Sequence, residues 1–194
     1  MVSDKFIKKY LRLAKFIAED QNPCYSRHVG AVIVDPVINK VVGTGYNGPP
    51  KSVPHCDSKE HLENVVWPQL SQFERDFIEL KPITREEFCE KWAGCKVCPR
   101  KLIKAEAGKR LELCSCAHAE ANAIVNASQN LTGCFIFCWC PLPCVECTKL
   151  IINAGITRVY CYKEAVDYSV GSRFLFKEAC VTIEEVEKNF IDTD

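Results

Sequence analysis

The sequence lacks an excess of charge of either sign. Its 194 residues include 25 lysines and arginines and 25 aspartates and glutamates, so the formal net charge is zero. A protein that binds long nucleic acid usually carries a basic excess, so this balance argues against that class of partner. The sequence also lacks an apolar run long enough to cross a bilayer, an internal repeat and a low-complexity tract. These absences leave a globular protein of ordinary composition, with 47% hydrophobic residues.

The first twenty residues lack the features of a targeting segment. MVSDKFIKKYLRLAKFIAED has no uninterrupted apolar core and no cleavage site, and it contains Asp4, Glu19 and Asp20. We therefore expect neither a signal peptide nor a transit peptide. We expect the protein to be cytoplasmic and to have no membrane partner. Fourteen cysteines are many for this length. In a reducing compartment we expect them to be free thiols, some of them bound to metal, and not disulfides.

One stretch, residues 114–147, carries most of the chemical information. It contains His118 and Glu120, about 25 residues of connection, and then Pro143 followed by Cys144 and Cys147. This H-x-E…P-C-x-x-C spacing is the signature of zinc deaminases of nucleobases. A lone histidine is more often a satisfied core residue, and a lone C-x-x-C is more often a structural or redox pair. The combination, in this order, favours a catalytic zinc site.

The chemistry explains why these residue types are needed. His118, Cys144 and Cys147 would supply three zinc ligands and leave the fourth position to water. Zinc lowers the pKa of that water, which can then attack C4 of a cytosine ring. Glu120 is the candidate general acid and base that moves protons to the leaving amine. Cys144 and Cys147 are three residues apart, so one helical turn places both sulfurs on the same helix face. His118 and Glu120 are only two apart, so they must flank the metal from the first turn of a helix.

The rest of the pattern predicts an α/β fold. Residues 3–19 have the apolar spacing of an amphipathic helix, and the runs Val29–Val34 and Val41–Tyr46 predict a hairpin. Strands and helices alternate after residue 133, which predicts βαβ units and a parallel half-sheet. The sum is a three-layer α/β/α sandwich around a mixed five-stranded sheet. The later elements are expected at Cys134–Trp139 (strand), Cys144–Asn153 (helix, ended by Gly155), Arg158–Tyr162 (strand), 172–180 (helix) and Cys180–Ile183 (strand).

Residues 57–113 are charged, with scattered aromatic side chains, and their pattern is weaker. We expect two short helices, at about 58–80 and 84–93, and then an irregular piece. We interpret this segment as an insertion within a single deaminase domain that covers residues 1–194.

These residues together resemble the deoxycytidylate (dCMP) deaminases, within the cytidine deaminase fold. The resemblance is carried by VGAVI, GYNG, HAEANAI and PCVEC, which begin at Val29, Gly45, His118 and Pro143. It implies hydrolysis of dCMP to dUMP and ammonia, activation by dCTP, inhibition by dTTP, and a homo-oligomer, with a hexamer as the expected form. The resemblance implies that the loop containing Asn47 lies beside the substrate sugar, although Asn47 could also be a turn asparagine that tolerates an unusual backbone angle. Arg27 is a candidate for the dCMP phosphate because its planar fork suits phosphate, and Tyr162 could pack near the ring.

Two further sites follow from the resemblance and from residues left over. The effector loop is expected to contain Gly45, Tyr46, Asn47, Gly48 and Lys51; its glycines allow close backbone approach, and Lys51 could contact a triphosphate that carries Mg²⁺. A plain turn after the hairpin is the alternative. Some family members carry a second zinc, and four thiolates would close such a structural site. Its candidate ligands here are Cys24, Cys56 and Cys116, with Cys98 or Cys114 as the fourth.

Two other functions remain open from the sequence. The same zinc chemistry serves deaminases of tRNA or single-stranded polynucleotide, although these should show a basic surface and stacking aromatic residues. A non-enzymatic zinc module could use Cys95, Cys98, Cys114 and Cys116, but it would leave Glu120 without a role. The candidate ligands of the second zinc could also be small buried hydrophobic residues without a metal.

Overall fold

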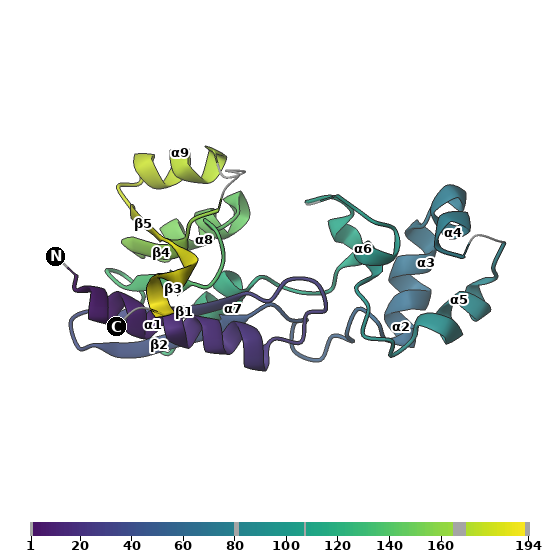
Figure 1. Cartoon of the computed structure of the whole chain (residues 1–194), viewed down its shortest axis with the longest axis horizontal. Coiled ribbons are helices and arrows are strands. Elements are labelled where there is room, and N and C mark those ends of the chain that lie inside the picture. Colours follow the sequence, from purple (N-terminus) through teal and green to yellow (C-terminus); the bar gives the residue numbers. More distant parts are fainter. Residues whose placement is uncertain (1, 80–81, 107, 165–169, 193–194) are drawn as a thin grey trace. The chain divides into compact units, whose positions relative to one another are not determined.

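The computed structural model describes residues 2–79, 82–106, 108–164 and 170–192. The chain divides into two compact units, which are traced in Figure 1. The first unit comprises Met1–Asn22, His28–Asn47 and His118–Asp194. The second comprises Pro23–Arg27 and Gly48–Ala117.

The first unit is built on one mixed sheet with the strand order β2-β1-β3-β4-β5. β1 runs antiparallel to both β2 and β3, with a register shift between Ile33 and Val34 in the hairpin. β3, β4 and β5 are parallel, so the predicted mixed five-stranded sheet is confirmed. The strands are β1 (Gly30–Asp35), β2 (Lys40–Tyr46), β3 (Phe135–Cys138), β4 (Arg158–Tyr162) and β5 (Thr182–Val186).

Helices cover both faces of this sheet, because alternate strand residues point to opposite sides. Val32 and Phe137 belong to an apolar cluster with α1, whereas Ile33 and Ile136 belong to a cluster with α7, α8 and α9. The structure therefore has the predicted helix–sheet–helix layers. The helices of this unit are α1 (Asp4–Phe16), continued by the wider turn η1 (Ile17–Gln21), α7 (Ala119–Val125), α8 (Val145–Asn153), α9 (Val170–Glu178) and the 3-10 turn η4 (Lys188–Asp192).

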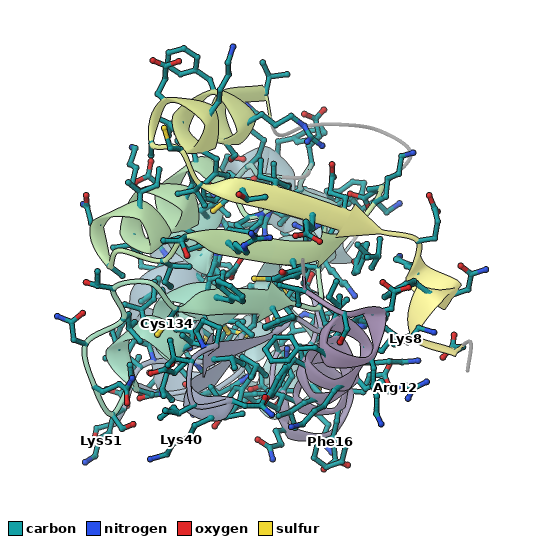
Figure 2. All side chains as sticks on the ribbon, turned by 90° about the vertical axis from the view of Figure 1, so that its left-hand side faces the viewer. Lys8, Arg12, Phe16, Lys40, Lys51 and Cys134 are labelled. Carbon is teal, nitrogen blue, oxygen red and sulfur yellow. The ribbon has the colours of Figure 1, made fainter. Side chains whose placement is uncertain are left out.

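The end of the described chain packs on α1. Arg12 Nε donates a 2.7 Å hydrogen bond to the carbonyl oxygen of Ile191, and Lys8 Nζ lies 5.1 Å from the centre of the Phe190 ring. Figure 2 shows Lys8 and Arg12 extending from α1 beside η4. The hydrogen bond joins positions 179 residues apart, so the two contacts hold the two ends of the first unit together beside its sheet.

The second unit is helical and has its own apolar core. Phe88 and Leu113 are completely buried there together with Leu62 and Val66, and Trp67 packs its ring 5.3 Å from that of Phe88. The elements are α2 (Lys59–His61), η2 (Leu62–Val66), α3 (Trp67–Gln69), α4 (Gln72–Glu79), α5 (Arg85–Trp92), α6 (Pro99–Leu102) and η3 (Leu111–Leu113).

Several predicted boundaries differ from those observed. The helix predicted at about 58–80 is broken at Leu70, whose backbone is extended, and Ser71 then caps a new helix by accepting from the backbone N–H of Glu74. The predicted strand at Cys180–Ile183 begins two residues later, at Thr182. Cys180 has a left-handed φ of 56°, a conformation that commonly follows the end of a helix. Residues 165–169, which precede α9, lie outside the described part.

None of the described helices has the length and apolar character needed to cross a bilayer.

Candidate active site and metal centre

Two helix starts bring the predicted zinc ligands together. His118 is the residue before α7, and Cys144 is the residue before α8; both have extended backbones at these cap positions. The predicted placement of His118 and Glu120 at a helix start is confirmed, because Glu120 is the second residue of α7. Cys147 lies in the first turn of α8. A helix start favours thiolate over thiol, which suits cysteine ligands.

The distances within this set fit a tetrahedral metal. His118 Nδ1 lies 3.5 Å from Cys144 Sγ and 3.4 Å from Cys147 Sγ. Zinc bonds of about 2.3 Å to sulfur and about 2.0 Å to nitrogen at a tetrahedral angle separate the two ligand atoms by about 3.5 Å. One nitrogen and two sulfurs also match the ligand chemistry of zinc. The three residues therefore fit a zinc ion, and they supply three of its four tetrahedral positions.

The pKa values of the two cysteine ligands, Cys144 and Cys147, shift in opposite directions. A hydrogen bond from Cys147, assisted by His118, lowers the pKa of Cys144 to about 3. The pKa of Cys147 is raised, because it donates that hydrogen bond and is buried. One thiolate is thus already favoured before a metal binds, and metal binding would displace the second proton.

Glu120 lies beside this set in a buried position. Burial raises the pKa of its carboxyl group, and the principal opposing influence is a backbone hydrogen bond. A raised pKa makes a carboxylate a better proton acceptor, which suits a group that must take up a proton and return it. Its side chain also interacts with Cys147, so it is adjacent to the ligand set without being one of the three closest donors.

The sequence analysis did not single out a second group of donors that contacts Glu120. Among the described residues, the sets of three ligand atoms within 4.8 Å of one another are the His118–Cys144–Cys147 set and a buried set of Glu120, Cys138 and Cys140. Cys140 Sγ donates to Glu120 Oε1 at 3.8 Å. The even spacing of Cys134, Cys138 and Cys140 in and directly beside β3 was the available signal, because such residues share a sheet face.

Close approach between α7 and the edge strand β2 fixes the position of the helix that carries Glu120. A Cβ atom on Gly45 would lie 2.2 Å from the carbonyl oxygen of Ala119. Asn47 Oδ1 accepts from the backbone N–H of Ala119 at 2.9 Å, and Asn122 Nδ2 donates to the carbonyl oxygen of Tyr46 at 2.8 Å. Three residues of the predicted effector loop, Gly45–Asn47, thus hold the start of α7.

The remaining predicted site residues lie elsewhere. Tyr162 packs its ring 5.3 Å from that of Trp139, and Trp139 belongs to the cluster on the α1 face of the sheet. Cys138 and Cys140 belong to the cluster on the other face, so Tyr162 is not brought together with the donors around Glu120. Its predicted contact with substrate stays a prediction, as do those of Arg27 and Lys51, which are exposed residues of the second unit.

Five cysteines converge within the second unit. Cys56 shares a hydrogen bond with Cys98, and this bond lowers the pKa of Cys98 to about 6. Cys116 hydrogen-bonds to both Cys114 and Cys24, and the bond from Cys116 lowers the pKa of Cys114 to about 6. These are the five candidates for a second metal. Cys95 is not part of this set: it is exposed, and its Sγ donates to the carbonyl oxygen of Lys91.

Comparison with known proteins agrees with this geometry. Residues 4–163 match the model of the cytidine and deoxycytidylate deaminase zinc-binding region. The deoxycytidylate deaminase of Schizosaccharomyces pombe is 28% identical over 151 residues, which are 77% of this chain and 34% of that protein. The human deoxycytidylate deaminase is 29% identical over 194 residues, 96% of this chain and 85% of that protein. The chain thus spans about a third of the length of the yeast relative.

A solved structure shares the fold. The dCMP deaminase of cyanophage S-TIM5, in complex with dCMP and dUMP, superposes with a TM-score of 0.58 at 20% identity and covers 96% of this chain and 100% of that one. Since the family match includes β1–β4 and both helix starts that carry the zinc-type ligands, the chain belongs to the family defined by the cytidine and deoxycytidylate deaminase zinc-binding region.

Proposed function

We propose that the protein hydrolyses dCMP to dUMP and ammonia. The observation that carries this proposal is the convergence of His118, Cys144 and Cys147 at tetrahedral spacing beside the buried carboxyl group of Glu120. The relatives that carry the name deoxycytidylate deaminase support the choice of substrate. The balanced charge of the chain supports a small nucleotide over a long polynucleotide.

The metal ligands and Glu120 would have different roles in adding water and releasing ammonia. His118, Cys144 and Cys147 would hold zinc, which supplies a water of lowered pKa as the nucleophile. Glu120 would carry two protons in turn, the first from the attacking water to N3 of the ring and the second from the new C4 hydroxyl to the amino group, which then leaves as neutral ammonia. Burial keeps bulk water from the carboxyl group, and Asn47, through Ala119, keeps the first turn of α7 in place.

The direct test is a deamination assay on Glu120→Gln. This substitution removes the proton carrier but keeps the size of the side chain. We expect turnover to fall by about 10²-fold or more, the scale of general acid–base catalysis, while zinc content stays at the wild-type level. Offering dCMP, dCTP, deoxycytidine and a cytosine-containing oligonucleotide side by side tests the substrate. Turnover of the oligonucleotide alone would overturn the proposal in favour of a polynucleotide deaminase.

We propose a structural zinc in the second unit as well, held by four of Cys24, Cys56, Cys98, Cys114 and Cys116. Its support is the hydrogen-bonded convergence of these thiols and the low pKa of two of them. Backbone N–H groups of residues 100 and 101 also donate to the sulfur of Cys98. Closure of a four-sulfur site requires the sulfurs to draw together, because no three of them meet the 4.8 Å separation that the first set meets.

Metal analysis separates one zinc from two. We expect two zinc ions per chain in the wild-type protein and one in Cys56→Ala. Cys95→Ala is the matched control, since Cys95 is a cysteine of the same unit that takes no part in the cluster; it should retain two. One zinc per wild-type chain would overturn the second site and leave the first untouched.

Regulation and assembly are proposed from the resemblance. We propose activation by dCTP and inhibition by dTTP, each with Mg²⁺, acting through the Gly45–Lys51 loop, since Gly45, Tyr46 and Asn47 contact the helix that carries Glu120. Coupling of ordinary size, about 1–3 kcal/mol, would shift apparent dCMP affinity by about 5- to 150-fold. Identical dCMP saturation curves with and without each triphosphate would exclude this control.

We further propose that the chain works as a single deaminase domain with an insertion at about residues 57–113, in a cytoplasmic homo-oligomer, a hexamer being the expected form. Light scattering of the purified protein measures the oligomer directly. A monomer at working concentration would overturn that part without bearing on the chemistry.

A further inference from the structure

A buried pair of thiols next to the catalytic carboxylate has no role in the proposed reaction. Cys138 is fully buried and Cys140 is 7% exposed. Cys138 is the last residue of β3, and Cys140 follows it on the same face. Glu120 reaches this pair from α7, and the three ligand atoms lie within 4.8 Å of one another.

The spacing of these donors suits a metal ion. A tetrahedral ion with bonds of about 2.3 Å to sulfur and about 2.1 Å to oxygen separates the sulfur and oxygen by about 3.6 Å. The observed distance from Cys140 Sγ to Glu120 Oε1 is 3.8 Å. Two sulfurs and one carboxylate select a thiophilic divalent cation over magnesium or calcium, which prefer oxygen ligands alone.

We propose that Glu120, Cys138 and Cys140 form an inhibitory site for a thiophilic divalent cation, of which zinc in excess over the catalytic ion is the test case. Binding replaces the two thiol protons with metal–sulfur bonds and adds one metal–carboxylate bond. The two protons go to solvent. Inhibition follows because the carboxylate that carries protons in the proposed reaction is then a metal ligand, so this consequence rests on the proposed function.

The cation can reach the pair from the catalytic side. His118 and Cys144 are exposed at the starts of α7 and α8, and Glu120 is the neighbour of both sets of donors. Cys138 and Cys140 are buried among apolar side chains of the sheet and Glu120 is buried as well, so we expect exchange through the exposed ligands His118 and Cys144. A bound nucleotide should therefore slow the binding of excess zinc.

The simpler explanation is that Cys138 and Cys140 are small hydrophobic residues of the core. The two explanations differ in what excess metal does. A plain core pair would take up no metal, and its replacement would change stability but not the response to zinc. The inhibitory site requires that the response to zinc weaken when either thiol is removed.

The experiment uses purified protein that retains its tightly held zinc after dialysis. Zinc chloride is titrated in, free zinc is followed with a chromophoric chelator, and the dCMP deamination rate is measured at each point. We expect one further zinc to bind and the rate to fall with the same midpoint. Cys138→Ala and Cys140→Ser should each need about tenfold or more additional zinc for the same fractional inhibition, the scale of losing a supporting metal contact. Each rate is compared with that of the same variant without added zinc.

Cys134→Ala is the matched control. Cys134 is another buried cysteine of the same cluster and sheet face, labelled in Figure 2, and it should respond to zinc as the wild type does. Glu120→Gln tests the third donor through binding alone and should weaken uptake of the further zinc. Excess dUMP should slow that uptake in the wild type.

The outcomes separate the two proposals. If the untreated protein has no dCMP deaminase activity, the proposed function fails, and chelator competition still tests the site. If the wild type takes up no zinc beyond its tightly held ions, the inhibitory site is overturned. The same holds if Cys138→Ala and Cys140→Ser bind zinc as tightly as the wild type does.

Discussion

A single methyl group on Gly45 should displace the helix that carries Glu120. A Cβ atom there would lie 2.2 Å from the Ala119 carbonyl oxygen and 2.3 Å from the Ala123 nitrogen. Both are backbone atoms of α7, so no side-chain rotation can relieve the overlap. Real Cβ atoms essentially never approach within 3.0 Å, so the separation from the oxygen must grow by at least 0.8 Å (3.0 minus 2.2).

The size of the effect follows from that displacement. Overpacking costs about 1–3 kcal/mol, and moving α7 also stretches the hydrogen bond from Asn122 to Tyr46. We expect Gly45→Ala to lose about 3 kcal/mol of unfolding free energy, which lowers Tm by roughly 6–12 °C for a chain of this size. A misplacement of about 1 Å can cost about 10²-fold in rate, so turnover of dCMP should fall by a similar factor.

The assay pairs urea unfolding with steady-state kinetics. Gly171→Ala is the control, because a Cβ atom there would meet only the tip of the Val145 side chain, at 3.0 Å, and alanine favours helix by up to about 1 kcal/mol. It should stay within about 1 kcal/mol of the wild type. If Gly45→Ala does not fold, Gly43→Ala supplies a milder overlap, at 2.5 Å from the Ala123 carbonyl oxygen. Wild-type stability in both β2 variants would refute the reasoning.

Two other substitutions test the packing around the same sheet. Asn122→Ala removes a 2.8 Å hydrogen bond to the β2 edge and Asn126→Ala a 3.4 Å one to Thr44; urea unfolding should show losses of about 0.5–1.5 kcal/mol, larger for Asn122, and the reverse order would contradict the contact geometry. The pKa of Tyr160 is raised to about 12, first by burial and then by Glu184. A raised pKa means that the contribution of Tyr160 to stability is complete below pH about 10, its unfolded value, and is lost as pH rises to about 12. Unfolding measured across that window should show a shallower decline for Tyr160→Phe, and equal slopes would argue against the shift.

The parts that could be predicted from the sequence are those governed by neighbouring residues. The β1–β2 hairpin follows from two apolar runs around Asp35-Pro36 and Asn39, and Asn39 does adopt a left-handed φ of 53°. Gly155 ends α8 with a φ of 76°, a conformation that glycine reaches without a steric penalty. The placement of Glu120 in the first turn of a helix followed from the chemistry, because the carboxylate and His118 must approach one ion from the same side.

Two features of the second unit differ in whether the sequence could have predicted them. The helix break at Leu70 could have been predicted, since Ser71-Gln-Phe-Glu74 is a capping box and Ser71 and Glu74 do exchange hydrogen bonds. The hydrogen bond between Cys56 and Cys98 could not have been predicted, because residues so far apart in the sequence meet only through the packing of the second unit.

The cysteines show why thiol chemistry had to be assigned from position. Cys98 and Cys114 have pKa values near 6 because neighbouring thiols donate to them. For Cys138 the hydrogen bond with Cys140 acts in the lowering direction, yet burial and the nearby Glu120 outweigh it and the pKa is raised to about 11. The same residue type thus offers a ready thiolate in one unit and a protonated, apolar thiol in the other. A metal ion should therefore fill a site among the first kind at low concentration, and it should occupy Cys138 and Cys140 only when its excess is large enough to displace their protons.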